Sequence, residues 1–171
     1  RHYSTLIINS DDYSLLTMTQ KVQQADYLDS YNIAIDYNAG TMHYIQYDDL
    51  EKEKELIIPI KDTIYDPFAI VYYLQNLELE INQKHIFTYY SRKNIKSLEL
   101  EILKSEKIKT PYSTDFCHLV VPKSTHGKYL LKNKGEMRIW YTSDKKQIPI
   151  KIQQKMRHGI MELLLEKYIE E

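Results

Sequence analysis

Apolar and polar side chains alternate along most of this chain, and this period of two constrains the fold more than any other feature. Residues 135–155 show it best, with the sequence GEMRIWYTSDKKQIPIKIQQK. The apolar positions of its two arms are Met137, Ile139 and Tyr141, and Ile148, Ile150 and Ile152. Successive side chains of a β-strand point to opposite faces, so this segment is expected to form a hairpin across the polar turn 143–146. Such a ribbon should wrap around the one helix that the sequence predicts or around a cavity beside that helix.

The same alternation predicts further strands. They lie at residues 31–37, 41–47, 56–60, 85–89, 98–102, 117–121 and 161–166. Gly40 can take a positive φ in the turn between the first two, and the strands at 85–89 and 98–102 are expected to pair through a loop that includes Arg92 and Lys93. Pro122 is expected to end the strand before it, because proline donates no ladder hydrogen bond. Residues 161–166 could also form a helix, since MELLLEKYIEE consists of good helix formers, but the alternation favours a strand.

One segment departs from the alternation. Asp66 is a suitable helix N-cap, Pro67 suits the first helical position, and Phe68, Val71 and Tyr72 recur at helical spacing. The predicted fold is therefore mainly β: a curved antiparallel meander or partly open β-barrel of about ten strands, with one short helix packed on or in it. The expected domain organisation is a single domain over residues 1–171.

Composition limits the possible partners. The chain has 16 Tyr, whose half-apolar rings suit sheet surfaces, and 23 basic residues against 24 acidic ones. A nearly neutral chain gives no field that would hold nucleic acid. No run approaches the roughly 20 apolar residues of a transmembrane helix. Residue 1 is Arg rather than an initiator Met, and the residues that follow it do not resemble a secretory leader. We therefore expect a soluble and trimmed chain.

Catalytic and metal signatures are weak. The histidines at 2, 43, 85, 118, 126 and 158 never pair at ligand spacing, and Cys117 and His118, being adjacent in a strand, point to opposite faces. Cys117 is expected to be a buried structural residue, and the four glycines are too scattered for a phosphate loop. We therefore expect no enzymatic activity, no metal and no cofactor. A hydrolase would depend on carboxylates such as Asp62 and Asp66.

Several short motifs, taken in order, resemble one protein family. They are Asp66-Pro67 followed by Tyr72-Tyr73-Leu74, Ile139-Trp140 with Ser143-Asp144, and Ile148-Pro149-Ile150-Lys151. They resemble the bacterial exported family known as domain of unknown function 3108. The resemblance implies a periplasmic or otherwise exported protein of the cell envelope, rich in antiparallel β structure and with no known reaction. Tyr112-Ser113 replace a glycine expected after Pro111, and the first strands of the family are expected to be missing before Arg1.

Two functional hypotheses remain beside the hydrolase. The first is a non-catalytic envelope protein that binds a hydrophobic or amphipathic ligand, a lipid or a glycan, in the concave face of the sheet. The candidate ligand-binding residues are aromatic: Phe68, Tyr72, Tyr73, Phe87, Tyr89, Trp140 and Tyr141. Some of them are expected to be core residues, and for Trp140 an exposed ring packed on aliphatic stems is favoured over a cavity-lining role. The second hypothesis is an envelope assembly protein that pairs with a protein partner, or with itself, through an exposed edge strand near residues 1–10.

Overall fold

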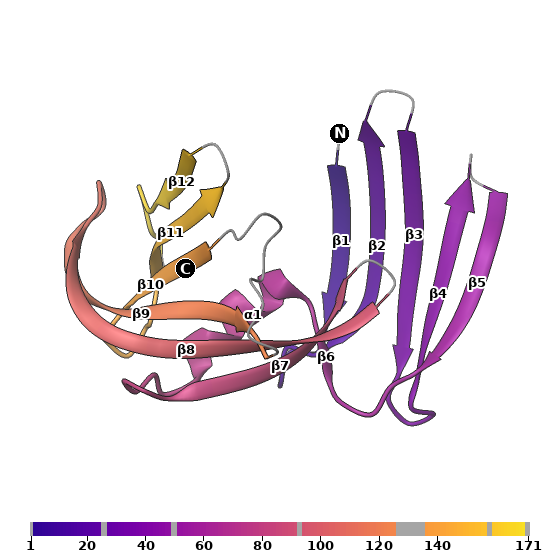
Figure 1. The fold of residues 1–171 in the computed structure, drawn as a ribbon, viewed down its shortest axis with the longest axis horizontal. Coiled ribbons are helices and arrows are strands. Elements are labelled where there is room, and N and C mark those ends of the chain that lie inside the picture. Colours follow the sequence, from indigo (N-terminus) through magenta and orange to yellow (C-terminus); the bar gives the residue numbers. More distant parts are fainter. Residues whose placement is uncertain are drawn as a thin grey trace. The chain divides into compact units, whose positions relative to one another are not determined.

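The computed structural model describes residues 2–24, 27–48, 51–91, 94–125, 136–156 and 159–169. Within these ranges the chain forms strands β1 to β12 and one short α-helix that continues into a 3-10 turn (Figure 1). The chain divides into two compact units, Arg1–Ala69 and Ile70–Glu171. That residues 1–171 fold as a single domain stays a prediction. His126, the loop residues 92–93 and the residues 157–158 lie outside the described ranges.

The first unit contains an antiparallel meander in which each strand pairs with the next (Figure 1). Its strands are β1 (His2–Ile8), β2 (Leu15–Gln24), β3 (Tyr27–Asp36), β4 (Thr41–Asp48) and β5 (Glu51–Pro59). Sequence alternation indicated β3, β4 and the end of β5, and Gly40 has the expected positive φ of 65° between the first two. Asp36 supports this turn, because its Oδ1 accepts hydrogen bonds from the backbone N–H groups of Asn38 and Ala39, both at 2.9 Å.

One face of this sheet is buried. Met18, Ile33 and Tyr44 occupy laterally paired positions on β2, β3 and β4, and each is at most 7% exposed. The short strand β6 (Ile64–Tyr65) follows, and the Tyr37 phenol donates to the carbonyl oxygens of Leu15 at 2.9 Å and Ile64 at 3.2 Å. Burial raises the pKa of Tyr37, which keeps the phenol protonated in this role.

The predicted helix is α1 (Pro67–Tyr73), continued by the 3-10 turn η1 (Leu74–Asn76). Asp66 is its N-cap, as predicted: the Asp66 carboxylate accepts a hydrogen bond from the Phe68 N–H at 2.8 Å. Asp66 is only 5% exposed, and burial raises the pKa of its carboxyl group. The helix therefore begins where the local sequence signals place it.

The second unit carries a longer meander, in the sheet order β12-β11-β10-β9-β8-β7. Its strands are β7 (Lys84–Ser91), β8 (Asn94–Lys109), β9 (Thr114–Ser124), β10 (Glu136–Thr142), β11 (Pro149–Met156) and β12 (Gly159–Leu164). The pairing of β7 with β8 is as expected, and β12 confirms the strand rather than the helix near the C-terminus. In Figure 1, β8 and β9 bend strongly, and β8 has a bulge between Ile102 and Lys104.

The prediction that Pro122 ends its strand is wrong, because β9 continues to Ser124. Pro122 pairs with Leu100 of β8. The described pairing of β9 with β10 extends only as far as Val120, so Pro122 lies where β9 needs a partner on one side only. A proline without an N–H is tolerated at such an edge position.

Each face of this curved sheet carries buried side chains. One face carries Phe87, Leu98, Leu100, Ile102, Val120 and Ile139, all at most 6% exposed. The other carries the cluster of Cys117, Leu119, Trp140, Ile148 and Ile150, against which Leu165 packs. The Leu165 carbonyl accepts a hydrogen bond of 3.3 Å from Tyr112 in the β8–β9 turn, so the end of the meander approaches its middle. Among the described strands β7 and β12 do not pair, and the curved sheet stays open.

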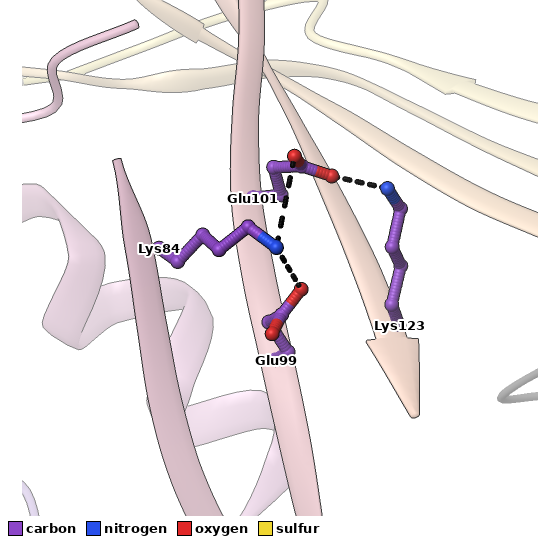
Figure 2. A network of polar contacts seen from close by, with 4 residues as sticks. All are labelled: Lys84, Glu99, Glu101 and Lys123. Atoms are coloured by element: carbon purple, nitrogen blue, oxygen red, sulfur yellow. Dashed lines mark hydrogen bonds and ion pairs between the residues drawn. The ribbon is translucent and has the colours of Figure 1, made fainter. Parts of the chain in front are cut away.

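Opposite charges alternate on the solvent-facing side of β7, β8 and β9. Figure 2 shows Lys84 between Glu99 and Glu101, at 3.0 Å and 4.0 Å, and Lys123 paired with Glu101. The hydrogen bond to Glu99 raises the pKa of Lys84, and the hydrogen bond from Lys123 lowers the pKa of Glu101. Because these side chains are solvated, the network favours the strand register but contributes little to stability.

Candidate functional site

The aromatic residues predicted to bind a ligand fall into different environments. On α1, Phe68 is 73% exposed and Tyr72 is 61% exposed. Tyr73 and Phe87 do lie together: their rings meet edge to face with centroids 5.7 Å apart, and Phe87 is buried. Tyr89 is half-buried on β7, where burial raises the pKa of its phenol. The Tyr73–Phe87 contact is a packing contact that anchors the end of α1 on the sheet.

Trp140 is a packing residue. It is 5% exposed, its indole Nε1 donates to Glu106 Oε1 at 2.8 Å, and the Lys151 ammonium lies 5.1 Å from the ring centroid. The hydrogen bond from Trp140 is the largest cause of the lowered pKa of Glu106, and a second comes from Lys104. The prediction that Trp140 packs is confirmed, but its ring is buried in an apolar cluster rather than exposed, because Leu119 and Ile150 pack around it.

Tyr141 is fully buried on the opposite face of β10. Its hydroxyl donates a hydrogen bond of 3.1 Å to the carbonyl oxygen of Val71 in α1. Burial raises the pKa of this phenol far above its usual range, so it remains a donor. The helix is thus bound to the inner face of the sheet through Tyr141 and through the Tyr73–Phe87 contact. A ligand-binding role for the seven aromatic residues stays a prediction.

A pocket of about 410 Å³ lies elsewhere in the second unit. It is formed by the segment after α1, by β9 and by the β10–β11 turn, and none of the seven aromatic residues lines it. Its lining consists of Gln75, Asn76, Leu77, Glu78, Leu79, Glu80, His118, Ser143, Asp144, Lys145 and Gln147. Nine of these eleven side chains can make hydrogen bonds. The pocket is therefore a polar site rather than an aromatic one.

The β10–β11 turn forms one wall and is held by Asp144. The Asp144 Oδ1 accepts hydrogen bonds from Thr142 Oγ1 at 2.7 Å, from the Lys146 N–H at 3.1 Å and from the Gln147 N–H at 3.2 Å. Asp144 is thus a turn residue whose side chain bonds the following backbone amides, within the turn that the sequence predicts at 143–146. A bulge between Trp140 and Tyr141, opposite Pro149, accompanies the turn, and proline is common at such irregular strand positions.

Gln147 joins the two walls of the pocket. It has a φ of 46°, which is unusual for a residue other than glycine. Its side-chain Nε2 donates to the carbonyl oxygens of Gln75 at 3.1 Å and Leu74 at 3.3 Å, and also to that of Leu77. These carbonyls belong to η1 and the residue after it, and that of Leu74 also accepts from the Leu77 N–H at 3.3 Å. One side chain thus bonds backbone acceptors at the end of the helix.

His118 reaches the pocket from β9, opposite Tyr141 of β10. Its ring Nδ1 lies 2.8 Å from the Ser105 hydroxyl on β8. The bond occupies one ring nitrogen and leaves Nε2 for another partner. His118 was predicted to point away from Cys117, and the register agrees, because Cys117 packs in the cluster around Trp140 on the other face.

Cys117 has the environment of a structural residue. It is fully buried, its Sγ donates to the Asp115 carbonyl at 3.6 Å, and burial, followed by nearby carboxylates, raises its pKa to about 11. A thiol in this state is a poor nucleophile. Within the described part of the chain, no three histidine, cysteine, aspartate or glutamate side chains gather as metal ligands would. No described helix has the length and apolar character needed to cross a bilayer.

Most pocket residues carry no local signal in the sequence. Ser143 and Asp144 stood out as turn residues, but His118 looked like any strand histidine, and residues 75–80 follow a helix without a recognisable motif. A positive φ at Gln147 cannot be inferred from a glutamine, because the residue type does not favour it. These residues become a site only when α1 docks on the sheet.

Comparison with known proteins places the chain in a family. No curated protein and no solved structure shows significant similarity to it. The family model described as "Protein of unknown function (DUF3108)" matches residues 1–166, which includes every strand from β1 to β12. The chain therefore belongs to the DUF3108 family.

Proposed function

We propose that this DUF3108 protein is a non-catalytic, exported protein of the cell envelope that binds a glycan in the pocket beside His118. The pocket itself carries the proposal. Its volume of about 410 Å³ falls in the range of small-molecule sites, roughly 300–1,000 Å³. The exported location in this proposal comes from the family resemblance.

The lining favours a glycan over a lipid. Only Leu77 and Leu79 are apolar among the eleven lining residues, and Leu79 is itself 5% exposed and packed into the protein. An acyl chain would have to be buried against amides, carboxylates and an ammonium group, which would lose their water without gaining a partner. Sugar hydroxyls can both donate and accept hydrogen bonds, and they match such a lining.

The walls of the pocket are held in place before any ligand arrives. Gln147 binds the backbone of η1, and Asp144 holds its own turn with three accepted hydrogen bonds. A site that is ordered in advance loses less conformational entropy on binding. The involvement of Asp144 in its own turn, together with the protonated thiol of Cys117, favours binding over catalysis.

The test uses N,N′,N″-triacetylchitotriose as a soluble glycan probe and follows the backbone amide signals by NMR. We expect the signals of residues 75–80 and 143–147 to shift, and those of β1 to β5 to stay unchanged. The variant Asn76→Ala removes an exposed pocket amide and should weaken binding, whereas Asn38→Ala removes an exposed amide in the β3–β4 turn and should not. Lipid in organic extracts of the purified protein, without shifts at the pocket, would contradict the proposal.

The assembly hypothesis remains a second candidate. It placed the edge near residues 1–10, and β1 is an edge strand of its sheet, but pairing through it stays a prediction. The exposed apolar side chains of β12 favour this other edge. This strand is an edge of its sheet, and its apolar side chains are exposed on both faces. The exposed fractions are 61% for Ile160, 38% for Met161, 54% for Leu163 and 40% for Leu164. Glu162, paired with Lys151 of β11, is the one charged residue of β12, and the strand contains no proline. A mostly apolar edge of this kind is a template for pairing with a strand of another chain.

Light scattering after gel filtration tests this second candidate. If chains assemble through β12, Ile160→Lys should shift the protein to monomer, because it places a charge at the pairing edge. Ile86→Lys is the matched control, since Ile86 is 67% exposed on β7 but does not lie on β12. A protein that is monomeric at all concentrations would rule this function out.

A further inference from the structure

We propose that His118 makes the specific contact with a ligand hydroxyl through Nε2, and that Ser105 positions its imidazole for this contact. The inference rests on the proposed function, because it concerns the same pocket. His118 lines the pocket, and its Nδ1 is hydrogen-bonded to Ser105 Oγ at 2.8 Å. Ser105 is not a lining residue, so its role would be to orient the ring.

The bulge in β8 is what brings these two residues together. Ile102 pairs with Val120, and continuing that register would place Lys104 opposite His118. The bulge between Ile102 and Lys104 shifts the pairing by one residue, so Ser105 lies opposite His118 instead. Bulges commonly redirect a side chain next to a functional site. Here the bulge places a hydroxyl beside the imidazole rather than an ammonium group.

The bond to Ser105 makes a hydroxyl the best partner for the remaining nitrogen. If Ser105 donates to Nδ1, then Nε2 carries the proton and donates to the ligand; if Nδ1 donates to Ser105, then Nε2 accepts. A sugar hydroxyl satisfies either state, whereas a carboxylate or an ammonium group satisfies only one. Three carboxylates in the lining, those of Glu78, Glu80 and Asp144, further disfavour an anionic ligand.

Both cross-strand neighbours of His118 lie on paired strands. Its cross-strand neighbour Tyr141 is fully buried and bonded to Val71 in α1, and its other neighbour is Ser105. Because neither neighbour lies on a free loop, the imidazole keeps its position relative to the pocket walls. A ligand group that meets Nε2 would therefore be selected by position as well as by chemistry.

Replacing His118 by asparagine or by glutamine tests the roles of Nδ1 and Nε2 one at a time. The side-chain amide of asparagine lies at about the distance of Nδ1 from the backbone, and that of glutamine at about the distance of Nε2. His118→Asn can keep the bond to Ser105 but cannot reach the ligand, so affinity for triacetylchitotriose should fall about tenfold, the effect of losing one hydrogen bond. His118→Gln should recover most of that loss. Equal affinities for His118→Asn and wild type would overturn the inference.

The positioning role of Ser105 is tested by removing its hydroxyl and then restoring it. Ser105→Ala should weaken binding and let the imidazole populate both tautomers, which long-range ¹⁵N NMR of the ring detects, and Ser105→Thr should restore both properties by returning the hydroxyl. A single unchanged tautomer and unchanged affinity in Ser105→Ala would overturn the positioning role. If the wild-type protein does not bind the probe, the proposed function fails and the inference fails with it. If the wild type binds the probe and the His118 variants bind it with the same affinity, only the inference is refuted.

Discussion

The Tyr141 phenol on β10 donates a hydrogen bond to the backbone carbonyl of Val71 in α1, across 3.1 Å in the buried interior of the second unit. Tyr141→Phe removes the hydroxyl, so the half-buried Val71 carbonyl loses this donor. We expect the free energy of unfolding to fall by about 1–3 kcal/mol. Urea unfolding measures it, and Tyr72→Phe, on a ring that is 61% exposed, should change it by less than about 0.5 kcal/mol. Equal effects of the two substitutions would contradict this role of the hydroxyl.

Gln147 should stabilise the pocket through its side chain despite its strained backbone. Gln147→Ala removes the bonds to Leu74 and Gln75 and keeps a Cβ at a φ of 46°. Gln147→Gly removes the same bonds but relaxes the backbone, so it should be more stable than the alanine variant by about 1 kcal/mol. Thermal unfolding of the three proteins gives the order wild type, glycine, alanine. A glycine variant more stable than wild type would show that the side-chain bonds contribute less than the backbone strain costs.

The hydrogen bond between Trp140 and Glu106 should make the free energy of unfolding decrease as the pH falls into the acid range. The hydrogen bond from Trp140 lowers the pKa of Glu106 in the folded protein, so the ionised carboxylate stabilises the fold above its unfolded pKa of about 4.3. This contribution disappears as the pH falls through the lower, folded pKa. In Trp140→Phe the Glu106 pKa should rise, and part of the pH dependence of unfolding should vanish. Carboxyl NMR titration checks this, with Glu101, bonded to Lys123, as the group that should not move.

The Cys117 thiol should be unreactive toward thiol reagents in the folded protein. With a pKa of about 11, its thiolate fraction at pH 8 is about one in a thousand, and the side chain is fully buried. Ellman's reagent at pH 8 should therefore react very slowly with the native protein and quickly once urea unfolds it. Rapid labelling without denaturant would mean that the cluster around Trp140 opens readily.

Much of the fold could be predicted from short-range patterns. Alternation located β3, β4, β7 and most of the later strands, the Asp66-Pro67 pair located the start of α1, and Gly40 located a turn. Each of these signals depends on residues a few positions apart, where backbone geometry and side-chain direction are coupled. Pro122 was misread because a proline is harmless wherever the neighbouring strand is absent, and strand neighbours are not a local property.

The candidate site depends on contacts that no short segment contains. Trp140 and Tyr141 are adjacent aromatic residues, yet one packs beneath Lys151 and the other bonds α1, because neighbours in a strand enter different environments. His118 becomes a pocket residue only because a bulge in β8 places Ser105 beside it and because Gln147 holds η1 across from it. Alternation and capping in the chain thus determine most of the strands and the start of the helix, and short motifs indicate the family. The pocket arises from the packing of α1 against a curved sheet, since packing joins residues that lie up to 73 positions apart.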